Sequence, residues 1–319
     1  MDENTKQKLE KRLGKTAFLK RLHVHSKLDK ISRHSSLCYR LFRHTLLLIL
    51  RFTGLYQHGY EEFKNIRVVH KKWSLPKLPA EFNGYKLLQL TDLHLCLDQG
   101  RIAKSLSKIL PHVHADACVF TGDFSNGAIS KDNECNNRIS LATQKELEKI
   151  TDMVECEKYG VLGNHDHIDL VDTIEATGIQ LLLNETIILK KGGDQIFLSG
   201  VDDASFFKSH DLDKASEGVP KDAFSILLSH TPEIYKIAQE KNYDIMLSGH
   251  THGGQICLPG GRHIKASNCH SGAVSRSWFY KSLQGYTSPG TGACKLPIRI
   301  CCPPEITIHE FIKTSIAKA

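Results

Sequence analysis

Apolar runs of strand length constrain the fold of this chain more than any other feature. They lie at 85–91, 117–121, 158–162, 196–201, 225–229 and 244–248, and most of them end at a cluster of Asp, His, Asn and Gly residues. Stretches with helical character lie between them, at 99–112, 141–156, 168–177 and 231–241. Strands that alternate with helices form sheets whose strand ends carry the functional loops. The pattern therefore predicts an α/β fold with a site on the loops after these strands.

Seven side chains that can bind a divalent metal follow five of these runs. They are Asp92, His94, Asp123, Asn164, His230, His250 and His252. Residues i and i+2 of an extended chain share one face, so Asp92 and His94 can hold one ion together. One carboxylate can bridge two ions, and Asp123 on the neighbouring strand end suits that position. Mixed oxygen and imidazole donors favour Mn, Fe, Zn or Co over Ca. We therefore expect two divalent ions, with Mn²⁺ as the first choice.

The motifs are informative as a set rather than one by one. A single Asp-x-His or Gly-Asp is more often an ordinary loop or turn, and a single Ser-His is most often incidental. The run from Gly249 to Gly254 is stronger, because two histidines between glycines have little use in core packing. Two ions about 3.5–4 Å apart can hold a phosphate, activate a water and neutralise developing charge. The set therefore predicts hydrolysis of a phosphoester or phosphoanhydride.

The content and order of these motifs resemble the calcineurin-like metallophosphoesterase superfamily over residues 66–311. The resemblance implies two facing mixed β-sheets flanked by helices. It implies one ion held by Asp92, His94, Asp123 and His252, and a second held by Asp123, Asn164, His230 and His250. His165 would then lie beside the substrate phosphate as the catalytic residue, stabilising the transition state or donating a proton to the leaving group.

Two further motifs are similar to a bacterial subgroup of this superfamily that acts at or near membranes. These are the continuation of the histidine motif to Ile256 and a tail in which residues 288–292 are followed by residues 303–306. The subgroup includes enzymes similar to the chlamydial-type UDP-2,3-diacylglucosamine hydrolase. The resemblance implies a lipid-linked nucleotide substrate, cleaved at its pyrophosphate to UMP and lipid X (2,3-diacylglucosamine 1-phosphate) in lipid A synthesis.

The N-terminal part of the chain differs from the rest in charge. Residues 1–51 hold thirteen Lys or Arg and four Asp or Glu, so the excess positive charge of the chain, +7, lies there. Residues 37–56 predict a basic amphipathic helix, but the apolar run 46–50 is too short to span a bilayer. We expect residues 1–60 to lie on the inner-membrane surface, peripherally and on its cytoplasmic face. A helix that packs on the catalytic domain, residues 61–319, or on a partner is the alternative.

Two other functions are compatible with the same motifs. A nuclease or phosphodiesterase would use the same ions, with the basic N-terminal part holding nucleic acid. We expect no nucleic-acid partner, because residues 52–319 carry no basic excess and the basic part also has a long apolar side. A non-catalytic scaffold of the same fold would be expected to have lost ligands, whereas every ligand position here is filled. The oligomeric state is left open.

Overall fold

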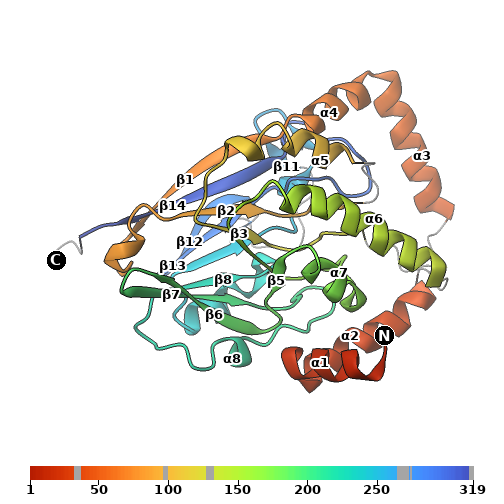
Figure 1. The fold of residues 1–319 in the computed structure, drawn as a ribbon. Helices are drawn as coiled ribbons and strands as arrows, with labels where there is room; N and C mark the ends of the chain where they lie inside the picture. Colours follow the sequence, from red (N-terminus) through yellow and green to blue (C-terminus); the bar gives the residue numbers. More distant parts are fainter. Residues whose placement is uncertain (32–36, 96–99, 127–132, 264–272, 274, 316–319) are drawn as a thin grey trace.

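The structure is a computed structural model that describes residues 1–31, 37–95, 100–126, 133–263, 273 and 275–315 (Figure 1). Two six-stranded mixed sheets form its centre. The predicted fold class, two facing mixed sheets flanked by helices, is confirmed.

The first sheet has the strand order β1-β14-β2-β3-β4-β5. Its strands are β1 (Arg67–Leu75), β14 (Glu305–Lys313), β2 (Lys86–Leu90), β3 (Ala117–Phe120), β4 (Glu157–Gly160) and β5 (Ile179–Leu181). Strands β2 to β5 run parallel, and β14 lies parallel to β1 and antiparallel to β2. Every residue of β3 is buried, because parallel strands are covered on both faces.

The second sheet has the order β12-β13-β9-β8-β7-β6. Its strands are β12 (Arg276–Tyr280), β13 (Leu283–Thr287), β9 (Ile245–Ser248), β8 (Ser225–Leu228), β7 (Asp194–Gly200) and β6 (Glu185–Lys191). The four inner strands run parallel and the two edge strands antiparallel. A separate small hairpin pairs β10 (Cys257–Leu258) with β11 (Arg262–His263).

The apolar core lies in three layers. Side chains of both sheets, such as Leu87 and Val119 from the first and Leu198 and Ile226 from the second, form the layer between them. Helices cover the two outer faces (Figure 1). On the first sheet these are α5 (Arg101–Leu106), α6 (Asn133–Thr151) and α7 (Val171–Glu175), and on the second α8 (Leu212–Ala215) and α9 (Tyr235–Glu240). Short 3₁₀ helices complete the connections: η2 (Ala80–Phe82), η3 (Leu110–His112), η4 (Ile168–Leu170), η5 (Pro232–Ile234) and η6 (His252–Gly254).

The N-terminal residues form helices α1 (Glu3–Leu13), α2 (Lys15–Ile31), α3 (Leu37–Phe52) and α4 (Leu55–Lys64). Leu9, Leu13 and Phe18 are buried in the core on the outer face of the first sheet. Arg12 forms ion pairs with Glu175 and Glu185, at 2.8 and 3.0 Å. Helix α1 and the first half of α2 thus pack on the catalytic domain. The predicted domain boundary near residue 60 stays a prediction.

Helix α3 carries a different kind of surface. Leu48 is 66% exposed, Ile49 53% and Phe52 95%. The helix ends at Phe52 rather than continuing to residue 56, because Gly54 has a left-handed φ of 74° and separates α3 from α4. None of the helices in the described part of the chain is both long and apolar enough to cross a membrane.

The predicted strands that precede the metal motifs are all present, whereas helix boundaries differ. The helix predicted at 141–156 begins at Asn133 and ends at Thr151, and the one predicted at 99–112 is the short α5 followed by η3. The sequence also predicts a short strand at 66–70, and in the structure this strand, β1, extends to Leu75 because all nine of its residues pair with β14. That pairing depends on residues more than 230 positions away, which a local pattern does not reveal.

Candidate metal centre

All seven predicted ligands lie at the carboxyl ends of strands from both sheets. Asp92 and His94 follow β2, Asp123 follows β3 and Asn164 follows β4, while His230 follows β8 and the two remaining histidines follow β9. Five of the seven have a positive φ: Asp92 (53°), His94 (47°), Asp123 (56°), His250 (72°) and His252 (51°). Side-chain-bearing residues seldom adopt this conformation, and such strained positions gather at functional sites.

The donors of the first predicted ion meet at one point. His94 Nε2 lies 3.0 Å from His252 Nε2 and 3.6 Å from Asp123 Oδ2. His252 Nε2 lies 3.3 Å from Asp92 Oδ1. Asp92, His94 and Asp123 place one ligand atom each within 4.8 Å of one another, all in buried positions. This spacing is that of ligands around one ion, since metal–ligand bonds to N and O are about 2.0–2.2 Å long.

The donors of the second predicted ion meet beside the first group. Asn164 Oδ1 lies 3.0 Å from His230 Nε2 and 2.7 Å from His250 Nδ1. His230 Nε2 lies 3.3 Å from Asp123 Oδ2, the same oxygen that faces His94. Asp123 Oδ2 thus lies between the two groups, where it could be shared by two ions. The residues present fit two adjacent divalent ions, although the identity of the ions is open.

Two glycines allow the loops to approach these ligands. A Cβ atom on Gly163 would lie 2.1 Å from Asp123 Oδ1, and one on Gly249 would lie 2.3 Å from Asp92 Oδ2. Neither distance is sterically possible, so any side chain at these positions would move a ligand. This gives the glycines of the sequence motifs a packing role at the site.

The protonation of the imidazoles is set by burial and by the carboxylates. Burial lowers the pKa of His94 to about 3 and that of His250 to about 4, and it lowers the pKa of His252 well below its usual value. These three rings are therefore neutral and have a lone pair for a metal. Burial also lowers the pKa of His230, but Asp123 and Asp92 raise it to about 10. An ion that binds His230 must therefore displace a proton.

His165 lies at the edge of the site and is not placed as a ligand. Its backbone N–H donates to Asp123 Oδ1 at 2.8 Å, and its ring lies edge-on to His94 at 5.1 Å. Burial lowers its pKa, but Asp123 raises it to about 9, so the ring is a cation at neutral pH. A cation beside a dimetal site suits the predicted contact with phosphate oxygens. Its catalytic role stays a prediction.

Asp166 has a role that the sequence did not suggest. Its place in the sequence predicts a cap on the helix near Ile168 or a contact that orients His165, but η4 has His167 as its N-cap and no side-chain cap bond. Its Oδ1 accepts from Ser125 N at 3.0 Å and its Oδ2 from Gly163 N at 2.8 Å. The carboxylate therefore ties the loop after β3 to the loop after β4. Both loops carry predicted ligands.

Two buried arginines that the sequence analysis missed donate hydrogen bonds to loops that carry predicted ligands. Arg21 of α2 pairs with Asp202, with its Nε 2.8 Å from Oδ2, and donates through Nη1 to Asp166 O at 2.5 Å. Arg299 donates to the carbonyls of Gly292 at 2.8 Å, Pro289 at 2.7 Å and His252 at 3.3 Å. A basic residue in an amphipathic or tail segment gives no sign that it will be buried, so only the fold reveals these contacts.

Cys294 is a further neighbour of the site that the sequence analysis did not single out. Its Sγ lies within 4.8 Å of ligand atoms of His94 and His252, and 4.0 Å from His165 Nε2. The thiol thus faces the first group of donors from the tail loop.

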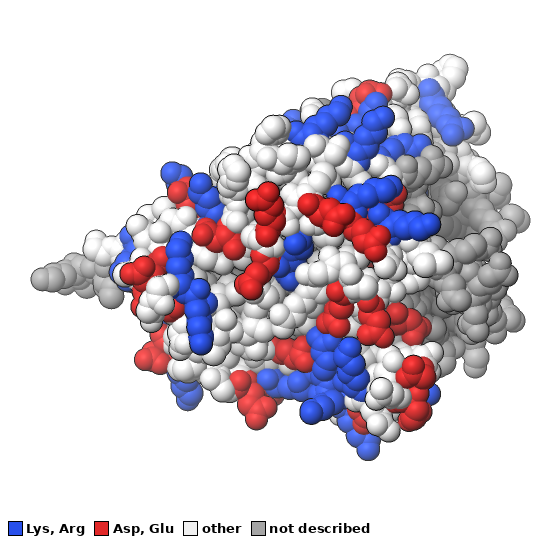
Figure 2. Space-filling model, in the orientation of Figure 1, with Lys and Arg blue, Asp and Glu red and all other residues white. Residues whose placement is uncertain are grey.

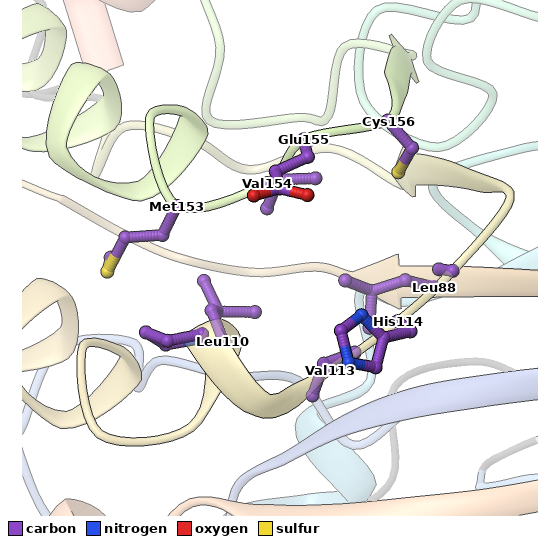
Figure 3. A pocket seen from close by; sticks show the side chains of 10 residues that line it. Leu88, Leu110, Val113, His114, Met153, Val154, Glu155 and Cys156 are labelled. Atoms are coloured by element: carbon purple, nitrogen blue, oxygen red, sulfur yellow. The ribbon is translucent and has the colours of Figure 1, made fainter.

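A small cavity of about 110 Å³ lies away from this centre (Figure 3). Leu88, Leu110, Val113 and Met153 give it an apolar wall. Its lining includes Cys156, just before β4, so it opens near the amino ends of the strands and not where the predicted ligands lie. It has no part in the metal chemistry.

The fold and this centre define the class of protein, and a comparison with known families agrees. The sequence model described as calcineurin-like phosphoesterase matches residues 85–254, just over half of the chain. The chain therefore belongs to this family, whose members are hydrolases with a divalent metal centre. The resemblance predicted from the motifs is confirmed.

Individual relatives are distant. The chain is 27% identical over 284 residues to the "Transmembrane protein with metallophosphoesterase domain" of Danio rerio, a match that covers 83% of this chain and 62% of that protein. It is 28% identical over 299 residues to the "UDP-2,3-diacylglucosamine pyrophosphatase LpxG" of Chlamydia trachomatis, covering 77% and 89%. It is 29% identical over 252 residues to the uncharacterized metallophosphoesterase YkuE of Bacillus subtilis, covering 75% and 82%. The chain thus spans less than two thirds of the zebrafish protein.

Proposed function

We propose that this chain hydrolyses the pyrophosphate of UDP-2,3-diacylglucosamine, with water as the second substrate and UMP and lipid X as products. The single observation that carries the hydrolysis is the pair of donor groups on either side of Asp123 Oδ2. The substrate is supported by the chlamydial relative, of which the match covers 89%. The predicted ions, Mn²⁺ first, are part of the same proposal.

The residues of the chain have separable tasks in this reaction. Two divalent ions, when bound, supply Lewis-acid polarisation of a phosphoryl oxygen and a nucleophile at neutral pH. The neutral rings of His94 and His250 hold their lone pairs toward the centre. The cationic ring of His165 stabilises negative charge on the phosphate oxygens, or donates its proton to the leaving group.

The test is hydrolysis of UDP-2,3-diacylglucosamine by the purified chain with Mn²⁺, with and without EDTA, following UMP in mild detergent. EDTA-sensitive release of UMP supports both the chemistry and the substrate. Cleavage of a generic bis-phosphate ester that EDTA abolishes, with no UMP from the lipid substrate, retains the hydrolase and rejects the substrate. The alternative, a nuclease or general phosphodiesterase, would give that second result.

His165→Ala should lower turnover about 10²–10³-fold while the protein keeps its metal, because one preformed donor to a developing charge is removed and no ligand is lost. Metal analysis by mass spectrometry and hydrolysis of the bis-phosphate ester measure the two effects. His167, two residues further on at the N-cap of η4, is not among the predicted ligands, so His167→Ala is the matched control and should leave turnover unchanged. Loss of metal from the His165 variant would show that this ring is a ligand after all.

We also propose that the chain lies peripherally on the cytoplasmic face of an inner membrane. The exposed apolar side chains of α3, Leu48, Ile49 and Phe52, support this, since they face solvent on a helix of mixed basic and apolar character. Arg12 and Arg21 form ion pairs with carboxylates of the domain. Part of the N-terminal positive charge is therefore neutralised inside the protein, which leaves less of it for nucleic acid.

Replacing Ile49 and Phe52 by Ser should reduce binding to phospholipid vesicles about tenfold or more, because each large apolar side chain contributes about 1.5–3 kcal/mol when fully buried. Sedimentation with vesicles measures the change. Ile188→Ser is the control, because Ile188 is also exposed, at 47%, but lies on β6 of the second sheet. An equal loss in the control, or no loss in the α3 variant, would reject α3 as the membrane contact.

A further inference from the structure

A basic groove lies on the outer surface of the molecule, between the end of α4 and helix α5. Its volume is about 680 Å³. Four of its lining residues are basic: Lys64 from α4, Arg101 and Lys104 from α5, and Lys108 just beyond it. Asn65 after α4 and Ser105 of α5 add polar side chains to the lining, and Glu61 of α4 adds one carboxylate. No motif of the metal centre lies in it.

The positive charge of the groove is only partly compensated. Lys64 forms an ion pair with Glu61 at 2.6 Å, on the same helix. Lys104 and Lys108 are exposed, and in the described part of the chain no carboxylate lies within ion-pair distance of either. Lys64 Nζ and Arg101 Cζ lie 5.0 and 5.7 Å from the centre of the Tyr60 ring, which brings these two cations to one aromatic surface. The groove therefore offers several cations to one anion.

Helix α4 connects the groove, which lies at its carboxyl end, to the exposed apolar part of α3. Helix α4, which forms one wall, begins at Leu55, three residues after α3 ends at Phe52. Helices α3, α4 and α5 lie at one end of the molecule in Figure 1, and Figure 2 shows Lys and Arg side chains over the α4–α5 part of that face. Exposed apolar side chains and a basic concavity joined by one helix suit the acyl region and the charged headgroups of a lipid surface.

We propose that this groove binds the phosphate headgroup of an anionic phospholipid while the exposed side chains of α3 enter the acyl region. The phosphate would accept hydrogen bonds from the exposed ammonium groups of Lys104 and Lys108, which are suited to its oxygens. The membrane contact would then include the catalytic domain itself, beyond the N-terminal segment. This inference rests on the proposed membrane location and is independent of which phosphoester is cleaved.

The test compares the full-length chain with a Lys104→Gln/Lys108→Gln variant. Vesicle sedimentation is measured with phosphatidylcholine alone and with phosphatidylcholine mixed with phosphatidylglycerol. Binding to the anionic vesicles should weaken about thirtyfold, as expected for two basic residues near an anionic surface. Binding to the neutral vesicles and hydrolysis of the soluble bis-phosphate ester should not change. Lys190→Gln/Lys236→Gln, two exposed lysines of the second-sheet side, removes the same charge elsewhere as a control.

Each remaining outcome contradicts the proposal in a recognisable way. Equal weakening in the control pair would mean that net charge, and not the groove, attracts the vesicles. Unchanged vesicle binding together with lost affinity for inorganic phosphate, measured by calorimetry, would assign the groove to free phosphate. Unchanged binding of both would reject it as an anion site. Failure to release UMP from the lipid substrate would change none of these three vesicle and phosphate results. The substrate proposal and the groove proposal can therefore be tested separately.

Discussion

Asp123→Ala should yield a folded protein that binds neither ion and has lost at least about 10³-fold of its activity. The reason is the position of Asp123 Oδ2, which lies 3.6 Å from His94 Nε2 and 3.3 Å from His230 Nε2, one ring from each donor group. Metal ions supply several kcal/mol of transition-state stabilisation, and each 1.36 kcal/mol is tenfold in rate. Metal content by mass spectrometry and bis-phosphate ester hydrolysis give the two readouts.

The same strand offers a matched control. Asp116 lies at the other end of β3, where its Oδ2 accepts from Lys86 N at 2.7 Å. Asp116→Ala removes a carboxylate and a hydrogen bond without approaching the centre, so metal and activity should remain. If the Asp123 variant kept one ion per chain, the carboxylate would belong to one group of donors alone and the bridging assignment would be wrong.

Arg21→Met should lower the free energy of unfolding by about 3–5 kcal/mol, because it leaves the buried carboxylate of Asp202 without its partner. Arg21 is 1% exposed and Asp202 is 0% exposed. The arginine also stacks over the Phe207 ring at 4.0 Å, which the methionine side chain can partly replace. Urea unfolding followed by circular dichroism measures the change.

Two further variants separate the ion pair from a general effect of the substitution. Arg21→Met/Asp202→Leu removes both charges and should recover most of the stability, since apolar replacement of a buried pair is often neutral. Lys15→Met changes an exposed residue of the same helix and should stay within about 0.5 kcal/mol of the parent. A double variant as unstable as Arg21→Met would show that the cost comes from lost packing of α2 and not from the unpaired charge.

The sequence identifies the seven metal-binding candidates more readily than the buried contacts that fix the loops on which they lie. The seven donors directly follow apolar runs of strand length. The end of such a run can be recognised from a few neighbouring residues, so these positions are predictable from local sequence. Arg21 contacts the loop after β4 and Arg299 the loop after β9, but the tertiary fold alone brings them to these partners. Arg21 and Asp202 are 181 positions apart, so no periodicity or spacing connects them. The basic pattern of the first helices therefore predicts a membrane-facing segment, although part of α1 and α2 lies in the core.

The helix boundaries were less predictable for a related reason. Helix α5 has only six residues, and its N-cap Gly100 offers no side-chain oxygen for a capping hydrogen bond. The tertiary packing of Ile102 and Leu106 fixes it, which propensity alone does not reveal. The glycines beside the predicted ligands, in contrast, can be recognised in the sequence. At Gly163 and Gly249 any side chain would collide with a ligand carboxylate.

The position of β14 has a consequence for how the chain folds as it is made. This strand, near the C-terminal end, lies between β1 and β2 and pairs with both. A ribosome therefore releases β1 and β2 long before their common neighbour exists, and both expose unpaired edges during that time. Such long-range pairing slows folding and favours aggregation of the incomplete chain. Nascent chains that stop before residue 305 should therefore need chaperone protection that the complete protein does not.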